Sequence, residues 1–163
     1  MLDSNFARII DAVRGACIEV YGPRLVGVVL FGSVAHGTMR PDSDIDLLIV
    51  AEPLPDGRMP RMDEFLRVEE RSAASLAEAR TRGVDTRLSP IIWTPDEVPQ
   101  AGFIKYDIAT EGVIVHDPDR RIDAILRGLR VRLEERGAIR ASYEGMPYWI
   151  LEPNLKPGQV VEI

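Results

Sequence analysis

The chain has 163 residues, 45% of them hydrophobic, and a formal net charge of −6. This length and apolar content predict one compact domain with a hydrophobic core. The negative charge argues against a general nucleic-acid coat protein, although an acidic surface can still contain a local basic groove.

The sequence predicts a cytoplasmic protein without a membrane segment. No stretch approaches the length of a transmembrane helix, and the opening Met1-Leu2-Asp3 does not resemble a signal peptide. The single cysteine, Cys17, cannot form an internal disulfide and lies on the apolar stripe of a predicted helix. It is therefore expected to be a buried, small hydrophobic residue.

Hydrophobic periodicity predicts helices and strands that alternate along the chain. A first helix begins at Ser4 and ends before Gly22, and a short helix follows the first strand. The other predicted elements are strands over 25–31, 45–50, 86–93 and 113–115, and helices over 61–82, 95–111 and 119–136. This order indicates one domain of mixed helices and strands over residues 1–140, followed by an extended tail over 141–163.

The tail is unusually apolar for a chain end. Two short extended runs, 146–151 and 159–163, flank the turn-forming Pro157-Gly158. Three interpretations remain open: a hairpin folded back on the core, a strand added to a neighbour, which would allow an oligomer, or simple packing of Tyr148 and Trp149.

The most informative segment joins the first two strands. Gly32 and Ser33 follow the first apolar run, where a glycine allows close backbone approach and a serine can cap a helix that attracts phosphate. Asp44 and Asp46 stand at the start of the second run. Residues two apart share a face of a strand, and two such carboxylates repel each other unless a cation lies between them. Oxygen ligands of this kind suit Mg²⁺.

Other interpretations of this segment are weaker. An Asp-x-Asp pair close to glycine and proline is often a solvated turn, but here the flanking strands and the Gly-Ser pair agree with a built site. A Walker loop requires Lys after its second glycine, where Gly37 is followed by Thr38. A dinucleotide fingerprint requires Gly-x-Gly, and a nucleophile elbow requires glycine two residues before the serine, where Phe31 stands.

Gly32-Ser33, ten intervening residues and Asp44-Ile45-Asp46 together resemble the signature of the DNA polymerase β-like nucleotidyltransferases, and most of all the minimal, antitoxin-like members. The resemblance implies an α+β fold with a small mixed sheet flanked by helices. It also implies that Gly32 and Ser33, with Ser43, bind a nucleoside triphosphate such as ATP. Asp44 and Asp46 would be catalytic and would hold Mg²⁺.

The family pattern includes a third carboxylate on a later strand, and here the sequence departs from it. Counting back from the helix predicted after Trp93, that position falls near Ser89, whereas Asp85 lies four residues earlier. Asp85 is the candidate third catalytic acid if a bulge or a longer loop shifts the strand register. Its other interpretation is a turn residue after Gly83.

Two functions remain open from the sequence. One is a Mg²⁺-dependent transferase that moves a nucleoside monophosphate from NTP to a hydroxyl on a protein or a small molecule, releasing pyrophosphate. The other is an antitoxin-type protein that binds a separately encoded helical toxin. The arginine-rich segment 119–140 is a candidate basic face, but it contains acids and lacks interleaved aromatic residues, so a nucleic-acid partner is disfavoured without being excluded.

Overall fold

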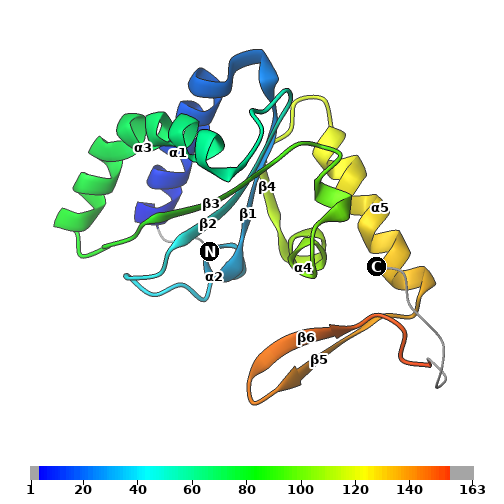
Figure 1. The fold of residues 1–163 in the computed structure, drawn as a ribbon. Coiled ribbons are helices and arrows are strands. Elements are labelled where there is room, and N and C mark those ends of the chain that lie inside the picture. The colour runs from blue at the N-terminus through cyan, green and yellow to red at the C-terminus, as the bar shows by residue number, and fades with distance from the viewer. Residues whose placement is uncertain (1–3, 155–163) are drawn as a thin grey trace.

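The computed structural model of the protein describes residues 4–154, and its centre is a four-stranded mixed sheet (Figure 1). The strand order is β3 (Leu88–Trp93), β2 (Ile45–Ala51), β1 (Leu25–Phe31) and β4 (Val113–His116). β1 is antiparallel to β2 and β4, whereas β3 is parallel to β2. The predicted α+β class and mixed sheet are confirmed.

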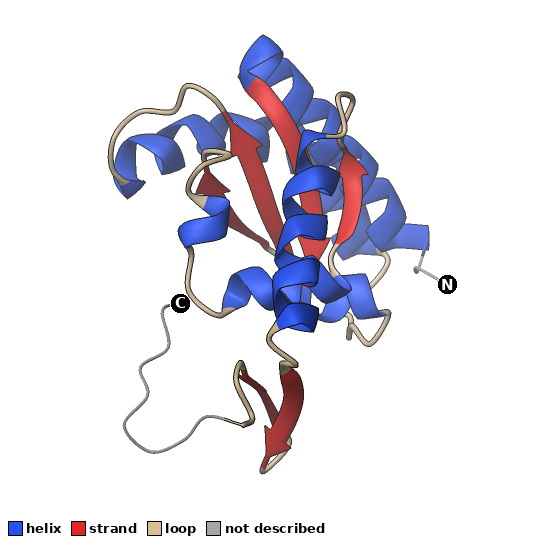
Figure 2. Cartoon of the chain, turned by 90° about the vertical axis from the view of Figure 1, so that its right-hand side faces the viewer, coloured by secondary structure: helices blue, strands red, loops and turns tan. Residues whose placement is uncertain are grey.

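Two pairs of helices cover the two faces of this sheet (Figures 1 and 2). α1 (Ser4–Tyr21) and α3 (Arg58–Thr81) pack on one face, and α4 (Ile104–Glu111) and α5 (Arg121–Glu135) pack on the other. Each pair encloses its own hydrophobic cluster. Because strand side chains alternate, Leu47 enters the α1–α3 cluster, while Leu48 faces α4 and α5.

The bounds of the first helix follow the local signals closely, and those of two later helices differ from the prediction. α1 ends at Tyr21, directly before a short 3-10 turn, Gly22–Arg24. α3 begins three residues earlier than predicted, so that Pro60 lies in its first turn. Proline is tolerated there, because the N–H that it lacks would have no partner within the helix. The stretch 95–111 is divided into a 3-10 turn, Val98–Gln100, and α4. None of the helices within residues 4–154 is both long and apolar enough to cross a membrane.

The single cysteine lies inside the first hydrophobic cluster. Cys17 on α1 is fully buried, and burial raises the pKa of its thiol to about 12. The thiol therefore remains protonated at neutral pH, and a protonated thiol is a poor nucleophile. Its prediction as a buried small hydrophobe is confirmed.

A separate two-stranded hairpin follows α5 and lies beyond the main sheet (Figure 1). β5 (Ile139–Tyr143) pairs with β6 (Met146–Ile150). The predicted boundary after residue 140 therefore falls inside β5. The hairpin proposed around Pro157-Gly158 needs residues 155–163, which lie outside the described part of the chain.

Candidate active site

The turn that follows β1 is built around a glycine. Gly32 has φ +68°, a left-handed conformation that favours glycine, and it opens the short helix α2 (Gly32–His36). Ser33 was predicted to cap this helix, but Phe31 occupies the cap position and Ser33 lies within the first turn. The Ser33 carbonyl accepts the N–H of Thr38 at 3.0 Å. Its hydroxyl has no hydrogen bond within residues 4–154, so it remains available to a ligand.

The two aspartates lie beside this turn. Asp46 pairs in register with Phe31 across the β1–β2 ladder, which brings its carboxylate against Gly32. A β-carbon at Gly32 would overlap Asp46 Oδ2, so glycine is the residue that admits this carboxylate. Asp44 precedes β2 by one residue, is exposed, and lies on the same face as Asp46 by strand alternation.

The surroundings of Asp46 oppose its negative charge. Partial burial raises the pKa of this carboxyl, and the charge of Asp44 raises it as well, while a hydrogen bond from Ser89 lowers it. A bound cation would relieve both unfavourable effects. Residues 4–154 contain no cluster of three or more potential ligand side chains for a metal ion. This donor set fits Mg²⁺, which commonly binds through one or two carboxylates and completes its shell with substrate phosphates and water.

Ser89 occupies the position beside Asp46 on the neighbouring strand. The β2–β3 pairing runs without a bulge from Ile45 opposite Leu88 to Val50 opposite Trp93, so Ser89 is the residue in register with Asp46. The register shift that would bring Asp85 to this position is therefore absent.

Asp85 itself lies in the exposed loop before β3. Its Oδ1 accepts from Arg80 Nε at 2.8 Å, and both side chains are mostly exposed. Its N–H donates to the Pro41 carbonyl at 2.9 Å. These contacts are those of a loop residue that fixes the approach to β3.

The loop before Asp44 is held by hydrogen bonds on both sides. The Ser43 hydroxyl accepts the Arg40 N–H at 2.8 Å, so this predicted nucleotide-binding group is engaged in its own turn. The Ser43 carbonyl accepts from the Thr86 hydroxyl at 2.6 Å, and Thr86 is buried. The Thr86 contact positions the aspartate pair and was not predicted, because Thr86 is distant in sequence and belongs to no motif.

A cavity of about 250 Å³ opens on the α4 side of Gly32 and Asp46. His36 of α2 and Glu111 of α4 face each other there, with Nε2 and Oε2 2.7 Å apart. Arg140 of β5 pairs with Glu111 and lies 3.5 Å from Asp107 Oδ1. The hairpin therefore contributes a cation to the cavity wall, balancing two carboxylates that would otherwise repel a phosphate.

The hairpin is fixed to α4 by its second strand as well. Trp149 Nε1 donates to Asp107 Oδ1 at 3.0 Å, and the Trp149 ring lies 6.2 Å from that of Tyr106. Packing of Trp149 was one of the interpretations left open by the sequence, whereas Tyr148 is exposed. The strand β5 was not predicted, because it is short and its polar residues give no strand signal.

Replacing Ser89 by aspartate should strengthen metal binding. The new carboxylate would lie beside Asp46, and affinity for hard cations rises with the number of charged oxygen ligands. We expect the Mg²⁺ dissociation constant of Ser89→Asp, measured by calorimetry, to fall roughly tenfold. Ser89→Asn, similar in size but uncharged, is the control. Equal affinities of the Asp and Asn variants would contradict the prediction.

The raised pKa of Asp46 should make the metal-free protein less stable as pH rises. A folded carboxyl with a raised pKa binds its proton more readily than the unfolded one, so stability is greatest below the unfolded pKa and falls as pH rises through the folded pKa. In EDTA at pH 8, Asp46→Asn should melt higher than the wild type, by no more than about 3 °C, and the difference should shrink toward pH 5. A lower melting temperature for the variant at pH 8 would contradict this.

Comparison with known proteins gives a family match and one curated relative. The family model for the nucleotidyltransferase domain matches residues 10–116, which is more than half of the chain. The curated protein is named "Putative protein adenylyltransferase MJ1305" and comes from Methanocaldococcus jannaschii. It is 42% identical over 53 residues, which are 32% of this chain and 36% of that protein. The alignment thus spans about a third of the length of the relative.

Solved structures share the fold at low sequence identity. A mutant form of the toxin-antitoxin pair MntA-HpeT matches with a TM-score of 0.50 and 16% identity, covering 82% of this chain and 89% of that one. A toxin-antitoxin structure with AMP-PNP gives a TM-score of 0.48 at the same identity and coverage.

Proposed function

Because this chain belongs to the nucleotidyltransferase domain family, we propose that it moves a nucleoside monophosphate, with ATP the expected donor, onto a hydroxyl group in a Mg²⁺-dependent reaction. The observation that supports this most is the contact between the Asp46 carboxylate and the Gly32 turn, with Asp44 on the same face. The turn proposed to bind phosphate and the carboxylates proposed to bind the metal are then adjacent.

In this proposal each residue has a limited task. Gly32 and the free hydroxyl of Ser33 bind the triphosphate, and Asp44 and Asp46 hold Mg²⁺. The bound metal would neutralise charge on the phosphates and on the attacking and leaving oxygens. Arg140 would keep the α4 carboxylates from repelling the triphosphate. Such a reaction depends mainly on positioning and electrostatics, so few further groups are required.

In this proposal the position of the family's third acid falls on Ser89, which is in register with Asp46, and not on Asp85. A hydroxyl beside Asp46 can donate a hydrogen bond, but it cannot supply a second charge to a metal pair. We therefore expect a slower enzyme, with one metal site stronger than the other. The relative's name, protein adenylyltransferase, supports a protein as the acceptor.

The direct test is transfer of label. The purified protein is incubated with each α-labelled NTP and a cell lysate, in Mg²⁺ and in EDTA. The expected result is label joined covalently to an acceptor in Mg²⁺ only, with ATP the best donor. Absence of label with every NTP, or equal label in EDTA, would overturn the proposal.

A second candidate function is an antitoxin-type binding protein with weak or no catalysis. Ser89 in place of a carboxylate favours it, and one structural neighbour, at a TM-score of 0.50, is a mutant form of a toxin-antitoxin pair. The distinguishing result would be a chain that binds MgATP, transfers nothing, and forms a stable equimolar complex with one helical protein on size exclusion.

A further inference from the structure

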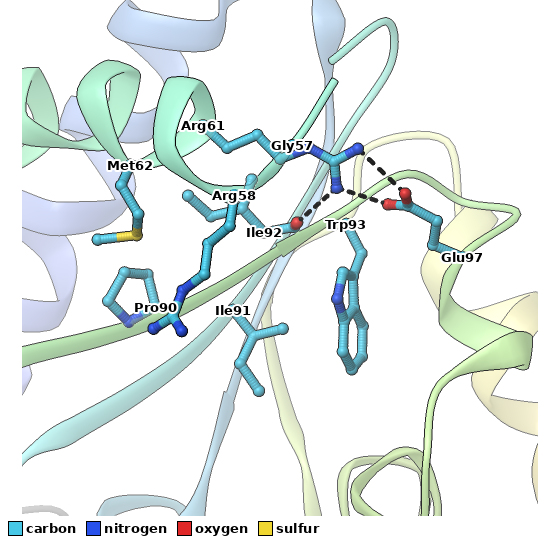
Figure 3. A pocket seen from close by; sticks show the side chains of 9 residues that line it. All are labelled: Gly57, Arg58, Arg61, Met62, Pro90, Ile91, Ile92, Trp93 and Glu97. Atoms are coloured by element: carbon cyan, nitrogen blue, oxygen red, sulfur yellow. Dashed lines mark hydrogen bonds and ion pairs between the residues drawn. The ribbon is translucent and has the colours of Figure 1, made fainter. Parts of the chain in front are cut away.

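A cavity of about 490 Å³ lies at the outer edge of the sheet, between β3 and the start of α3 (Figure 3). Met62, Ile91 and Trp93 supply much of its apolar wall. This volume is in the range of sites that bind small molecules or a few residues of a peptide. None of the residues assigned above to nucleotide or metal lines it.

The charges of this cavity do not balance. Arg61 and Glu97 neutralise each other through two contacts of 2.8 and 3.0 Å. Arg58 has no hydrogen bond or ion pair within residues 4–154, and its side chain extends toward Pro90 and Ile91, away from Glu97 (Figure 3). An unpaired guanidinium beside an apolar wall favours an anionic group on an apolar body.

The cavity is aligned with the candidate active site. Ser89, Ile91 and Trp93 alternate along β3 and so share the face of the sheet that contains Asp46. Ser89 lies opposite Asp46, which places the Ile91 and Trp93 positions roughly 7 and 13 Å further along the strand. A ligand resting on these two side chains can therefore extend one end to the aspartate pair.

The edge of β3 is poorly suited to the addition of another strand. Pro90 has no N–H to donate, and the outward carbonyl of Ile92 already accepts from Arg61 at 3.1 Å. Binding here must therefore depend on the side chains that line the cavity, chiefly Arg58 and Trp93.

We propose that this cavity is the acceptor subsite, resting on the transferase function proposed above. The acceptor is an anionic, hydroxyl-bearing group: its carboxylate or phosphate binds Arg58, and its apolar or aromatic part packs on Trp93 and Ile91. Its hydroxyl oxygen attacks the α-phosphorus of the nucleotide. An O–P bond forms, the bond to the bridging β-phosphate oxygen breaks, pyrophosphate leaves with that electron pair, and the hydroxyl proton passes to solvent.

The first test measures binding without requiring activity. 4-Hydroxyphenylacetate is titrated into the protein, and the indole N–H resonance of Trp93 is followed by NMR, with Trp149 as internal reference. We expect a saturable shift at Trp93, weakened roughly tenfold in Arg58→Gln. Arg67→Gln, an exposed site on the same helix outside the cavity, should bind as the wild type does. No saturable shift, or equal shifts from the uncharged amide of the probe, would overturn the proposal.

The second test separates the acceptor from the nucleotide. Transfer of label from α-labelled ATP to lysate is measured with MgATP affinity for the wild type, Arg58→Gln and Arg67→Gln. We expect Arg58→Gln alone to lose roughly tenfold in transfer at limiting acceptor, with MgATP affinity unchanged. An equal loss of MgATP affinity would show that the cavity serves the nucleotide and would overturn the assignment.

Filtration of the lysate identifies the source of the acceptor, since label retained above 10 kDa indicates a protein side chain and label that passes indicates a free compound. If the wild type transfers no label at all, the proposed function fails, while the probe titration still decides whether the cavity binds this class of anion.

Discussion

Asp46→Asn is expected to lower nucleotidyl transfer by about a thousandfold, because it removes the more enclosed of the two carboxylates proposed to bind Mg²⁺ and metal stabilisation contributes several kcal/mol to such reactions. The amide keeps the size and one oxygen of the side chain, so the cavity beside Gly32 should retain its shape. Mg²⁺ affinity, measured by calorimetry with a non-hydrolysable nucleotide present, should fall in parallel with the rate. The rate itself is measured with α-labelled ATP at saturating Mg²⁺.

The matched control is Asp42→Asn, four residues earlier, in the loop before β2. Asp42 is exposed and lies 3.3 Å from the Arg40 guanidinium, so its replacement makes the same change in net charge without touching the aspartate pair proposed to bind the metal. Its rate should stay within about twofold of the wild type, the size expected for a screened surface charge. Equal losses in both variants would show that general electrostatics, and not metal binding, explains the effect of Asp46.

The main sheet and its motif were predictable from local pattern. β1 and β2 are short apolar runs buried on both faces. Such a run predicts a buried strand from its own residues, without knowledge of its neighbours in the fold. The Gly-Ser turn and the aspartate pair stand at the ends of these runs, so the two predicted strands brought them to one edge. Their family likeness was therefore visible without the structure.

Strand register required the structure. Counting back from the helix predicted after Trp93 placed the third position near Ser89, but a bulge or a longer loop would have moved the assignment toward Asp85. The uninterrupted β2–β3 pairing decides between these two registers. Strand register depends on which side chains of neighbouring strands pack together in the core. A single sequence does not show which residues those are.

The cation supplied by the hairpin was beyond sequence reasoning for a different physical reason. Arg140, Glu111 and His36 come from three segments separated by 29 and 75 residues, and each alone resembles a surface residue. They meet only because α4 packs between the Gly32 turn and the hairpin. Contacts that depend on the packing of distant elements leave no local pattern.

Gly32→Ala is expected to reduce transfer by about a hundredfold, because small displacements of catalytic groups cost that much. Two effects combine at this position. The left-handed backbone at φ +68° costs a residue with a β-carbon about 1–2 kcal/mol, and the new methyl group would overlap Asp46 Oδ2. The carboxylate must then rotate away from the turn, which separates the proposed metal-binding pair from the proposed phosphate-binding turn. The rate and the Mg²⁺ affinity should both fall.

Gly37→Ala separates these two effects. Gly37 has nearly the same backbone conformation, φ +70°, but a β-carbon there has nothing within 4 Å. Both variants should therefore lose a similar amount of stability in urea denaturation, whereas only Gly32→Ala should lose Mg²⁺ affinity. If Gly37→Ala lost metal binding to the same degree, backbone strain in α2 would explain both, and the close approach of Asp46 to the turn would have no part in catalysis. A loss of Mg²⁺ affinity in Gly32→Ala alone would show that Gly32 is needed to leave room for the Asp46 carboxylate, and not only for the approach of a phosphate.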